Sequence, residues 1–229
     1  RILDWNLSGA EAEYVRAFEI DPNSTPSNYF IAAFYAAIGE RDKALTYLRR
    51  TAKIDPASLW VSNFACEIYR YFGLIDDAIA AGERALQLDP TFLYGEPLLA
   101  ALYREMGRFD DAIALYKKSQ DLSGRVPFGL AFTYAKMNRR SEAREVLKAA
   151  CASRVSYTPG DAIAHGHMVL QEHEEAIREL ERAYEEHSSS LHFIGIAPEF
   201  APLRSDERFV TIVKKIGLEP DRVFSVTAS

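Results

Sequence analysis

The sequence predicts an all-α protein in which pairs of antiparallel helices stack into a superhelix. A ten-residue segment occurs three times with little change, beginning at Gly39, Gly73 and Gly107, at a constant spacing (73 − 39 = 34 and 107 − 73 = 34). Within each copy the apolar residues follow the period of a helix. The 229 residues are 48% hydrophobic, which supplies a sizeable core. Because a two-helix unit cannot bury its apolar face alone, neighbouring copies must stack.

The third copy shows the anatomy of one unit. Its first helix is expected over residues 93–106, where Leu99 and Leu102 keep helical spacing. Gly107 supplies the left-handed residue that closes a helix, and acidic residues then suit the positive end of the second helix. Ala112 begins the apolar stripe of that second helix. Its small side chain lets the two helices approach closely.

The first element is an incomplete unit. Residues 1–24 supply only the second helix of a pair, over residues 8–20, because residues 1–6 are too few to form a first helix. One flank of this helix therefore lacks its partner. Two explanations stay open: a chain cut within a repeat, or contact of this flank with another chain or an upstream domain.

Five helix pairs are expected over residues 25–185. The alanine that begins the second helix recurs, at first with the spacing of 34 and then with spacings of 31 and 33 (143 − 112 = 31 and 176 − 143 = 33). These alanines are Ala44, Ala78, Ala112, Ala143 and Ala176. The shortened spacing indicates that the last two units depart from the regular pattern.

The C-terminal part is predicted to cover the last repeat. Residues 186–217 combine an irregular segment, in which Pro198 and Pro202 exclude a continuous helix, with a helix expected over residues 206–216. Solenoids need such a cap on the exposed face of the terminal unit. Residues 218–229 are expected to form a mobile tail.

The repeated pattern resembles the tetratricopeptide repeat (TPR). The family's unit of 34 residues pairs two helices, and its Tyr…Gly…Asp-x-Ala…Pro pattern is matched here by Tyr35, Gly39, Asp42, Ala44 and Pro56. The resemblance covers about residues 1–185. It implies a right-handed superhelix whose first helices line a concave, protein-binding face. The family's early Trp is missing, and its place holds Asn28, Ser62, Glu96, Pro127 and Gly160.

A narrower resemblance concerns the two ends of the array. Residues 4–22 (DWNLSGAEAEYVRAFEIDP) and 198–218 (PEFAPLRSDERFVTIVKKIGL) are similar to the TPR segment of multidomain bacterial signalling proteins. In those proteins the segment follows a winged-helix DNA-binding, nucleotide cyclase or protein kinase domain, none of which is found in this sequence. The resemblance implies a regulatory module within a longer chain.

Composition excludes several classes of function. The net charge is −6 and Lys and Arg form no run, so a nucleic-acid-binding surface is not expected. No apolar run reaches the roughly 18 residues of a membrane helix. Cys66 and Cys151 lie in different repeats without a CxxC pattern, which predicts free thiols and no zinc site. A cytoplasmic location is expected, or a periplasmic one if a longer chain carries an upstream membrane helix.

Sequence patterns for catalysis are not found. The chain has no GxxxxGK[ST], GxGxxG, HExxH or GxSxG. The histidines of HGH at residues 165–167 are two positions apart, and such positions point to different faces of a helix. Acidic pairs such as Asp110–Asp111 recur at helix starts, where they complement the helix dipole. We therefore expect no enzyme activity, no cofactor and no metal.

The resemblance places the candidate partner-binding residues on the first helices of the repeats. The set is rich in aromatic residues, which suits a peptide or helix with apolar anchors, and it lacks the carboxylate clamp of chaperone-tail binders. These residues are Tyr29, Phe30, Trp60, Asn63, Phe64, Arg70, Tyr71, Tyr94, Leu98, Arg104, Phe128 and Phe132. Other inward positions include Ala33, Glu67, Ala101, Glu105, Arg125, Lys136, Asp161, His165 and Met168.

Three uses of these aromatic residues remain open. They pack between neighbouring helices, they form an open groove, or the groove is already occupied by residues 191–202. The function predicted is a non-catalytic interaction module that binds a protein or peptide, other domains of a parent chain, or a second copy. The alternative is a small-ligand sensor that uses the aromatic groove.

Overall fold

The fold is described by a computed structural model for residues 5–152, 160–188 and 190–226. The prediction of an all-α protein built from sequential antiparallel pairs is confirmed. The helix α1 (Leu7–Ile20) comes first and stands without a partner from the same repeat. The pairs that follow are α2 (Thr25–Ala37) with α3 (Arg41–Ile54), α4 (Leu59–Tyr71) with α5 (Ile75–Leu88), α6 (Gly95–Glu105) with α7 (Phe109–Ser123), α8 (Phe128–Lys136) with α9 (Arg140–Ala152), and α10 (Gly160–Val169) with α11 (His173–Glu185).

The turn inside each pair repeats one backbone conformation. Gly39, Gly73 and Gly107 have φ angles of 80°, 69° and 76°, in the left-handed region. Asn138 and Gln171 take this place in the last two pairs, with φ angles of 62° and 63°. Their spacing, 31 and then 33 residues, is the one at which the sequence pattern slips. A left-handed residue thus recurs at the turn of each of the five pairs, at the spacing of the sequence pattern.

The small residue at the start of each second helix is buried. Ala44, Ala78, Ala112 and Ala176 are 0% exposed and Ala143 is 1% exposed. A larger side chain at these positions would push apart the two helices of a pair, because interiors are close-packed.

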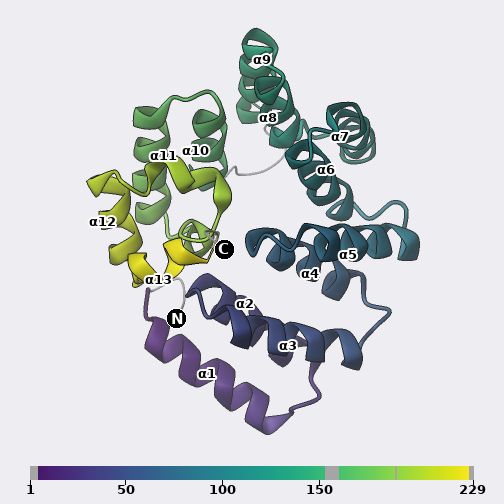
Figure 1. The fold of residues 1–229 in the computed structure, drawn as a ribbon, viewed down its shortest axis with the longest axis vertical. Coiled ribbons are helices and arrows are strands. Elements are labelled where there is room, and N and C mark those ends of the chain that lie inside the picture. Colours follow the sequence, from purple (N-terminus) through teal and green to yellow (C-terminus); the bar gives the residue numbers. More distant parts are fainter. Residues whose placement is uncertain (1–4, 153–159, 189, 227–229) are drawn as a thin grey trace.

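The helix pairs are arranged around a centre, so that the last pair returns towards the first (Figure 1). In this view α2, α6 and α10 lie nearer the centre than α3, α7 and α11. The start of α1 and the helix α13 (Pro220–Ser225) lie close together, near α2. The array is therefore bent into a nearly closed ring.

The C-terminal segment lies between the last helix pair and the first repeat. It consists of η2 (Leu191–Phe193), η3 (Pro198–Leu203), α12 (Glu207–Lys215) and α13 (Pro220–Ser225). The η2 turn contacts α2, η3 contacts α10, and α12 contacts α11. Its apolar side chains are buried in one core with those of the first and last repeats: they include Leu191, Ile194, Ile196, Phe200, Leu203, Phe209 and Val213.

The prediction of a mobile tail from residue 218 needs correction. Leu218 is 4% exposed, and Val223, within α13, is 0% exposed. A Cβ atom at Gly195 would lie 2.5 Å from Val223 Cγ2, so α13 packs directly against the irregular segment. Leu218, Val223 and Val226 therefore belong to the core, and residues 218–226 are part of the folded structure. Residues 227–229 lie outside the described part of the chain.

The end of the chain also covers part of the N-terminal unit. Trp5 stacks on Tyr184 and His187, with ring centroids 5.8 and 5.7 Å apart. Arg222 in α13 pairs with Glu40 at 3.2 Å. The C-terminal part of the same chain also lies against the start of α1, since a Cβ atom at Gly217 would lie 3.2 Å from Leu7 Cδ1.

Candidate partner-binding groove

Three of the predicted aromatic residues are exposed. Phe30, Trp60 and Tyr94 are 49%, 57% and 61% exposed. Trp60 and Tyr94 occupy equivalent places in consecutive repeats (94 − 60 = 34), and their ring centroids are 5.2 Å apart. Phe92 packs edge-on against Trp60 at 5.3 Å. These rings form a small aromatic surface, which we call the Trp60–Tyr94 surface.

Other predicted residues are buried by the chain itself. Phe64 is 4% exposed and packs on Tyr29, with centroids 4.1 Å apart. Tyr71 is 8% exposed and stacks on Phe193 of η2 at 5.4 Å. Phe132 is 5% exposed. For these side chains the packing alternative describes the structure, and Tyr71 also shows that residues 191–202 reach the concave face.

The remaining aliphatic, polar and aromatic candidates are partly buried. Leu98 packs at the edge of the cluster around Leu99 and Leu102. The Asn63 side-chain oxygen is buried without a hydrogen-bond partner among the described residues. Phe128 lines a cavity described below.

The two predicted arginines meet a carboxylate that the sequence analysis missed. Arg70 and Arg104 are equivalent positions of neighbouring repeats (104 − 70 = 34). Arg70 Nη1 donates to Glu105 Oε1 and to Glu199 Oε1, both at 2.6 Å. Arg70 is 9% exposed, so this is a buried pair. Glu199 lies in η3, and its approach to α4, 129 residues earlier, leaves no signal in the sequence pattern.

Arg104 lies beside this pair but is held more loosely. Its Nη2 is 3.7 Å from Glu105 Oε1 and 3.8 Å from Glu199 Oε1. Its Nη1 donates to the Tyr116 hydroxyl at 3.4 Å. Its guanidinium carbon is 5.5 Å from the centre of the Phe132 ring, a cation–π distance.

The protonation of this cluster follows from burial and charge. Burial alone would raise the pKa of Glu199, but the attraction of Arg70, followed by that of His165, outweighs it and holds this pKa well below 4.5. His165 lies 3.5 Å from Glu199, yet burial lowers its pKa from 6.5 to about 4. At neutral pH, Glu199 is therefore ionised and His165 is neutral.

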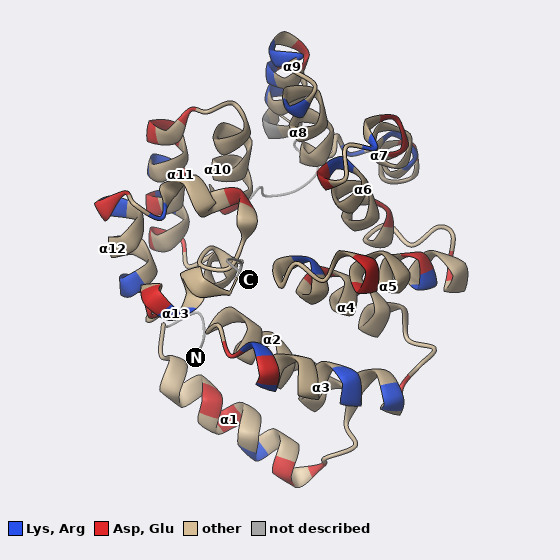
Figure 2. Ribbon diagram, viewed as in Figure 1, with Lys and Arg blue, Asp and Glu red and all other residues tan. Residues whose placement is uncertain are grey.

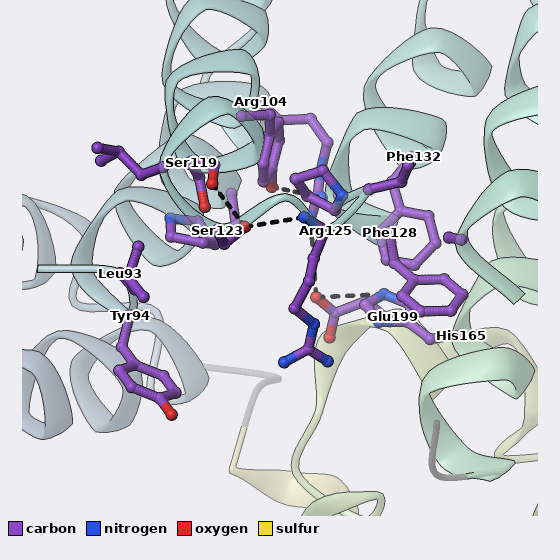
Figure 3. A pocket seen from close by; sticks show the side chains of 18 of the residues that line it. Leu93, Tyr94, Arg104, Ser119, Ser123, Arg125, Phe128, Phe132, His165 and Glu199 are labelled. Carbon is purple, nitrogen blue, oxygen red and sulfur yellow. Dashed lines mark hydrogen bonds and ion pairs between the residues drawn. The ribbon is translucent and has the colours of Figure 1, made fainter. Parts of the chain in front are cut away.

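A cavity of about 570 Å³ opens next to this cluster. Figure 3 shows Leu93 and Tyr94 at one side, with Phe128, Phe132, His165 and Glu199 at the other. A second cavity, of about 660 Å³, adjoins it and shares Arg104, Phe132, His165 and Glu199. Glu199 thus belongs to the wall of both.

The irregular repeat explains why the first cavity exists. The first helices α2 and α4 have 13 residues each, but α8 has 9. Residues 124–127, which correspond to the first turn of α4, are not helical in this unit. The spacing of 31 residues therefore removes a helical turn that would otherwise fill the space between α6 and α8.

The histidine pattern and the cysteines lead to no metal site among the described residues. His165 faces Glu199, whereas His167 Nδ1 lies 3.0 Å from Glu172. No group of three or more His, Cys, Asp or Glu in the described part could hold a metal ion. Cys66 is buried, and burial raises the pKa of its thiol to about 12. The side chain of Cys151 lies outside the described part.

Charged residues of both signs are interspersed over the helices (Figure 2). The scatter agrees with the sequence, in which Lys and Arg form no run. Across the residues that the structure describes, no helix is both long and apolar enough to span a bilayer.

Comparison with known proteins agrees with this fold. Residues 98–124 match the family model of the tetratricopeptide repeat. Comparison with curated protein sequences gives no match. The structure is similar to TTC0263, a thermophilic TPR protein of Thermus thermophilus, with 21% identity and a TM-score of 0.59, covering 82% of this chain and 100% of that one.

Two further solved structures share the fold. One is PilW, described as a widely conserved type IV pilus biogenesis factor, with 20% identity and a TM-score of 0.59, covering 82% of this chain and 89% of that one. The other is a TPR protein from Parabacteroides merdae, with 13% identity and a TM-score of 0.56, covering 97% of this chain and 91% of that one. At these identities the likeness shows the fold: this chain has the tetratricopeptide repeat fold.

Proposed function

We propose that the protein is a non-catalytic interaction scaffold that binds a protein or peptide partner through the Trp60–Tyr94 surface. The observation that carries this proposal is the exposure of two large aromatic side chains at equivalent places of consecutive repeats, 57% and 61%. Aromatic residues dominate binding energy when a partner buries them. Phe30, which is 49% exposed and stacks on Tyr14 of α1 at 6.3 Å, is a further candidate in the first complete repeat.

The buried candidates have a different part in this proposal. Phe64, Tyr71 and Phe132 hold the first helices and the C-terminal segment in place, and so they fix the position of the exposed rings. Arg70 serves the same purpose through its pair with Glu199 at 2.6 Å. A partner would therefore bind a rigid surface.

We also propose that the chain is a module of a larger signalling or transcription-regulatory protein. This part of the proposal rests on residues 4–22 and 198–218. TTC0263 and the Parabacteroides merdae protein are described as TPR proteins, and PilW as a type IV pilus biogenesis factor. None of these descriptions mentions a signalling domain. The resemblance of these two segments alone supports a regulatory role here. Expression of this chain next to candidate upstream domains would test it through their mutual affinity.

The partner surface is tested by selecting peptides from a display library on the wild-type protein and measuring their affinity by calorimetry. Trp60→Ala and Tyr94→Ala should each weaken binding by about 2 kcal/mol, which is roughly a thirtyfold loss. Leu88→Ala, at a 42% exposed residue of α5, is the matched control and should leave affinity unchanged. Far-UV circular dichroism should be the same for all variants, since the three residues are exposed.

Two outcomes would overturn the proposal. Equal affinity of the selected peptides for wild type, Trp60→Ala and Tyr94→Ala would remove this surface from consideration. Enrichment of no peptide at all on the folded protein would contradict peptide binding itself.

A further inference from the structure

One buried arginine has hydrogen-bonding capacity that the fold does not use. Arg104 is 6% exposed, and within the described residues it donates one hydrogen bond, to the Tyr116 hydroxyl at 3.4 Å. The nearest carboxylate oxygens, on Glu105 and Glu199, lie 3.7 and 3.8 Å away. Both oxygens already accept from Arg70 at 2.6 Å. Because a guanidinium carries five N–H donors and a buried charge needs a partner, Arg104 can still bind an anion.

The charges around the 570 Å³ cavity favour an anion there. Its lining contains Arg70, Arg104 and Arg125, but among acidic residues only Glu199 of the described part of the chain. The lining therefore carries an excess of two positive charges (3 − 1 = 2), within a chain of net charge −6. A concave site lined by one sign of charge concentrates ligands of the opposite sign.

The rest of the lining is apolar and has a defined shape. Phe128, Phe132 and Leu93 contribute to the wall, and the volume lies within the usual range of small-molecule sites, about 300–1,000 Å³. A Cβ atom at position 129 would lie 2.1 Å from Tyr116 Cζ, so only Gly129 permits that ring to lie against α8. The hydroxyl of the same ring contacts Arg104. The glycine thus helps to set the position of the arginine.

We propose that this cavity binds a small amphipathic anion, whose carboxylate, sulfonate or phosphate group pairs with Arg104 while an aromatic or aliphatic body packs on Phe128 and Phe132. This site is distinct from the proposed partner surface, although Tyr94 borders both. The ligand enters where the irregular repeat lacks its helical turn, beside residues 124–127.

The proposal is tested with a fluorescent aromatic anion, 1-anilinonaphthalene-8-sulfonate, and its uncharged analogue N-phenyl-1-naphthylamine. We expect one saturable site for the sulfonate, with an affinity about tenfold or more above that of the neutral compound, because charge-assisted hydrogen bonds are the strong ones. Thermal unfolding should shift upward with the sulfonate concentration, as for any ligand that binds the native state.

Variants locate the site. Arg104→Gln should lower the affinity for the sulfonate about tenfold and leave that for the neutral compound unchanged. Arg125→Gln removes a second positive charge of the lining at an exposed position, without disturbing the core. It should lower the affinity for the sulfonate several-fold, which is about the contribution of one partly exposed ion pair. Ala101→Phe fills the cavity and should abolish binding of both probes. Arg16→Gln, at an exposed residue of α1, is the charge-matched control.

Equal affinity for the charged and neutral probes would overturn the anion site. Unchanged sulfonate binding in both Arg125→Gln and Ala101→Phe would overturn its location. Trp60→Ala should not alter sulfonate binding, so failure of the partner surface and failure of this site give different results.

Discussion

Two regions of this molecule are built from the same repeat but are stabilised differently. The first repeats, the last repeat and the C-terminal segment share one large core that runs from Ala10 to Val226. The middle units, from α5 to α9, depend on small separate clusters, for example Ala100 with Ala112, Tyr116 and Leu130. A helix pair in the middle therefore packs against the pair before it and the pair after it. Pairs near the two ends pack against the C-terminal segment as well.

The difference shows what the C-terminal segment does. In an open solenoid each repeat contacts only its neighbours, and stability is a sum of local terms. Here η2 and η3 contact α2 and α10, and Glu199 reaches α4. These contacts join repeats that are far apart in the sequence, so we expect those repeats to unfold together. In the middle units the contacts are mainly with neighbouring repeats, as in an open solenoid, and the cavity lies where these units meet α10 and η3.

Among the changes that test this comparison, breaking the pair between Arg70 and Glu199 should lower the stability most. We expect Glu199→Gln to cost about 3–5 kcal/mol of unfolding free energy, because it leaves a buried guanidinium with one carboxylate fewer. Chemical denaturation measures the loss. Glu142→Gln, which breaks the exposed pair between Glu142 of α9 and Arg139, is the control and should change nothing measurable.

If both variants unfold at the same denaturant concentration as the wild type, the pair does not tie the two ends together. Amide exchange sharpens the test: in Glu199→Gln it should quicken in α2, α4 and η2, while α7 and α9 keep their wild-type rates.

Acid should destabilise the region formed by the first repeats, the last repeat and the C-terminal segment before it destabilises the middle units. The folded pKa of His165 is lowered to about 4, from 6.5 in the unfolded chain, so the unfolded state binds more protons between these values. Stability from this group is complete above pH 6.5 and is lost as pH falls to about 4, by an amount on the order of 3 kcal/mol. Glu199 acts in the same direction below about pH 4.5, since its pKa is depressed.

Denaturant unfolding at pH values from 7.5 to 4 measures how steeply the free energy of unfolding depends on pH. His165→Gln should remove most of it above pH 4.5, because glutamine does not titrate. A slope that is identical in wild type and variant would show that another group is responsible.

The smallest and most local loss of stability is expected when a larger side chain is placed in the core of a middle unit. Ala112→Leu should cost about 1–3 kcal/mol, since Ala112 is 0% exposed where α6 meets α7. Hydrogen exchange should quicken in α6–α9 and not in α2 or α13. Ala176→Leu, at the equivalent position of the last pair, should instead disturb α12 and α13 as well. Identical exchange patterns in the two variants would contradict the comparison.

The sequence determined the local structure and its register. Left-handed residues at Gly39, Gly73 and Gly107, small residues such as Ala112, and the shift to a spacing of 31 are properties of single repeats, which depend on contacts between neighbours in the chain. Exposure of Trp60 and Tyr94 followed less directly, because Phe64, another aromatic residue of α4, is 4% exposed and covered by Tyr29 of α2.

Only the tertiary structure decided the closure of the ring and the charged cluster inside it. Whether η3 reaches α4 depends on the small rotation between successive repeats, which accumulates over five pairs and is encoded in no single one of them. The sequence therefore placed Arg70 and Arg104 on the inner helices but could not place Glu199 beside them. For the same reason it treated residues 218–226 as a tail: Leu218 and Val223 have a surface to bury only because the first repeat returns to meet them.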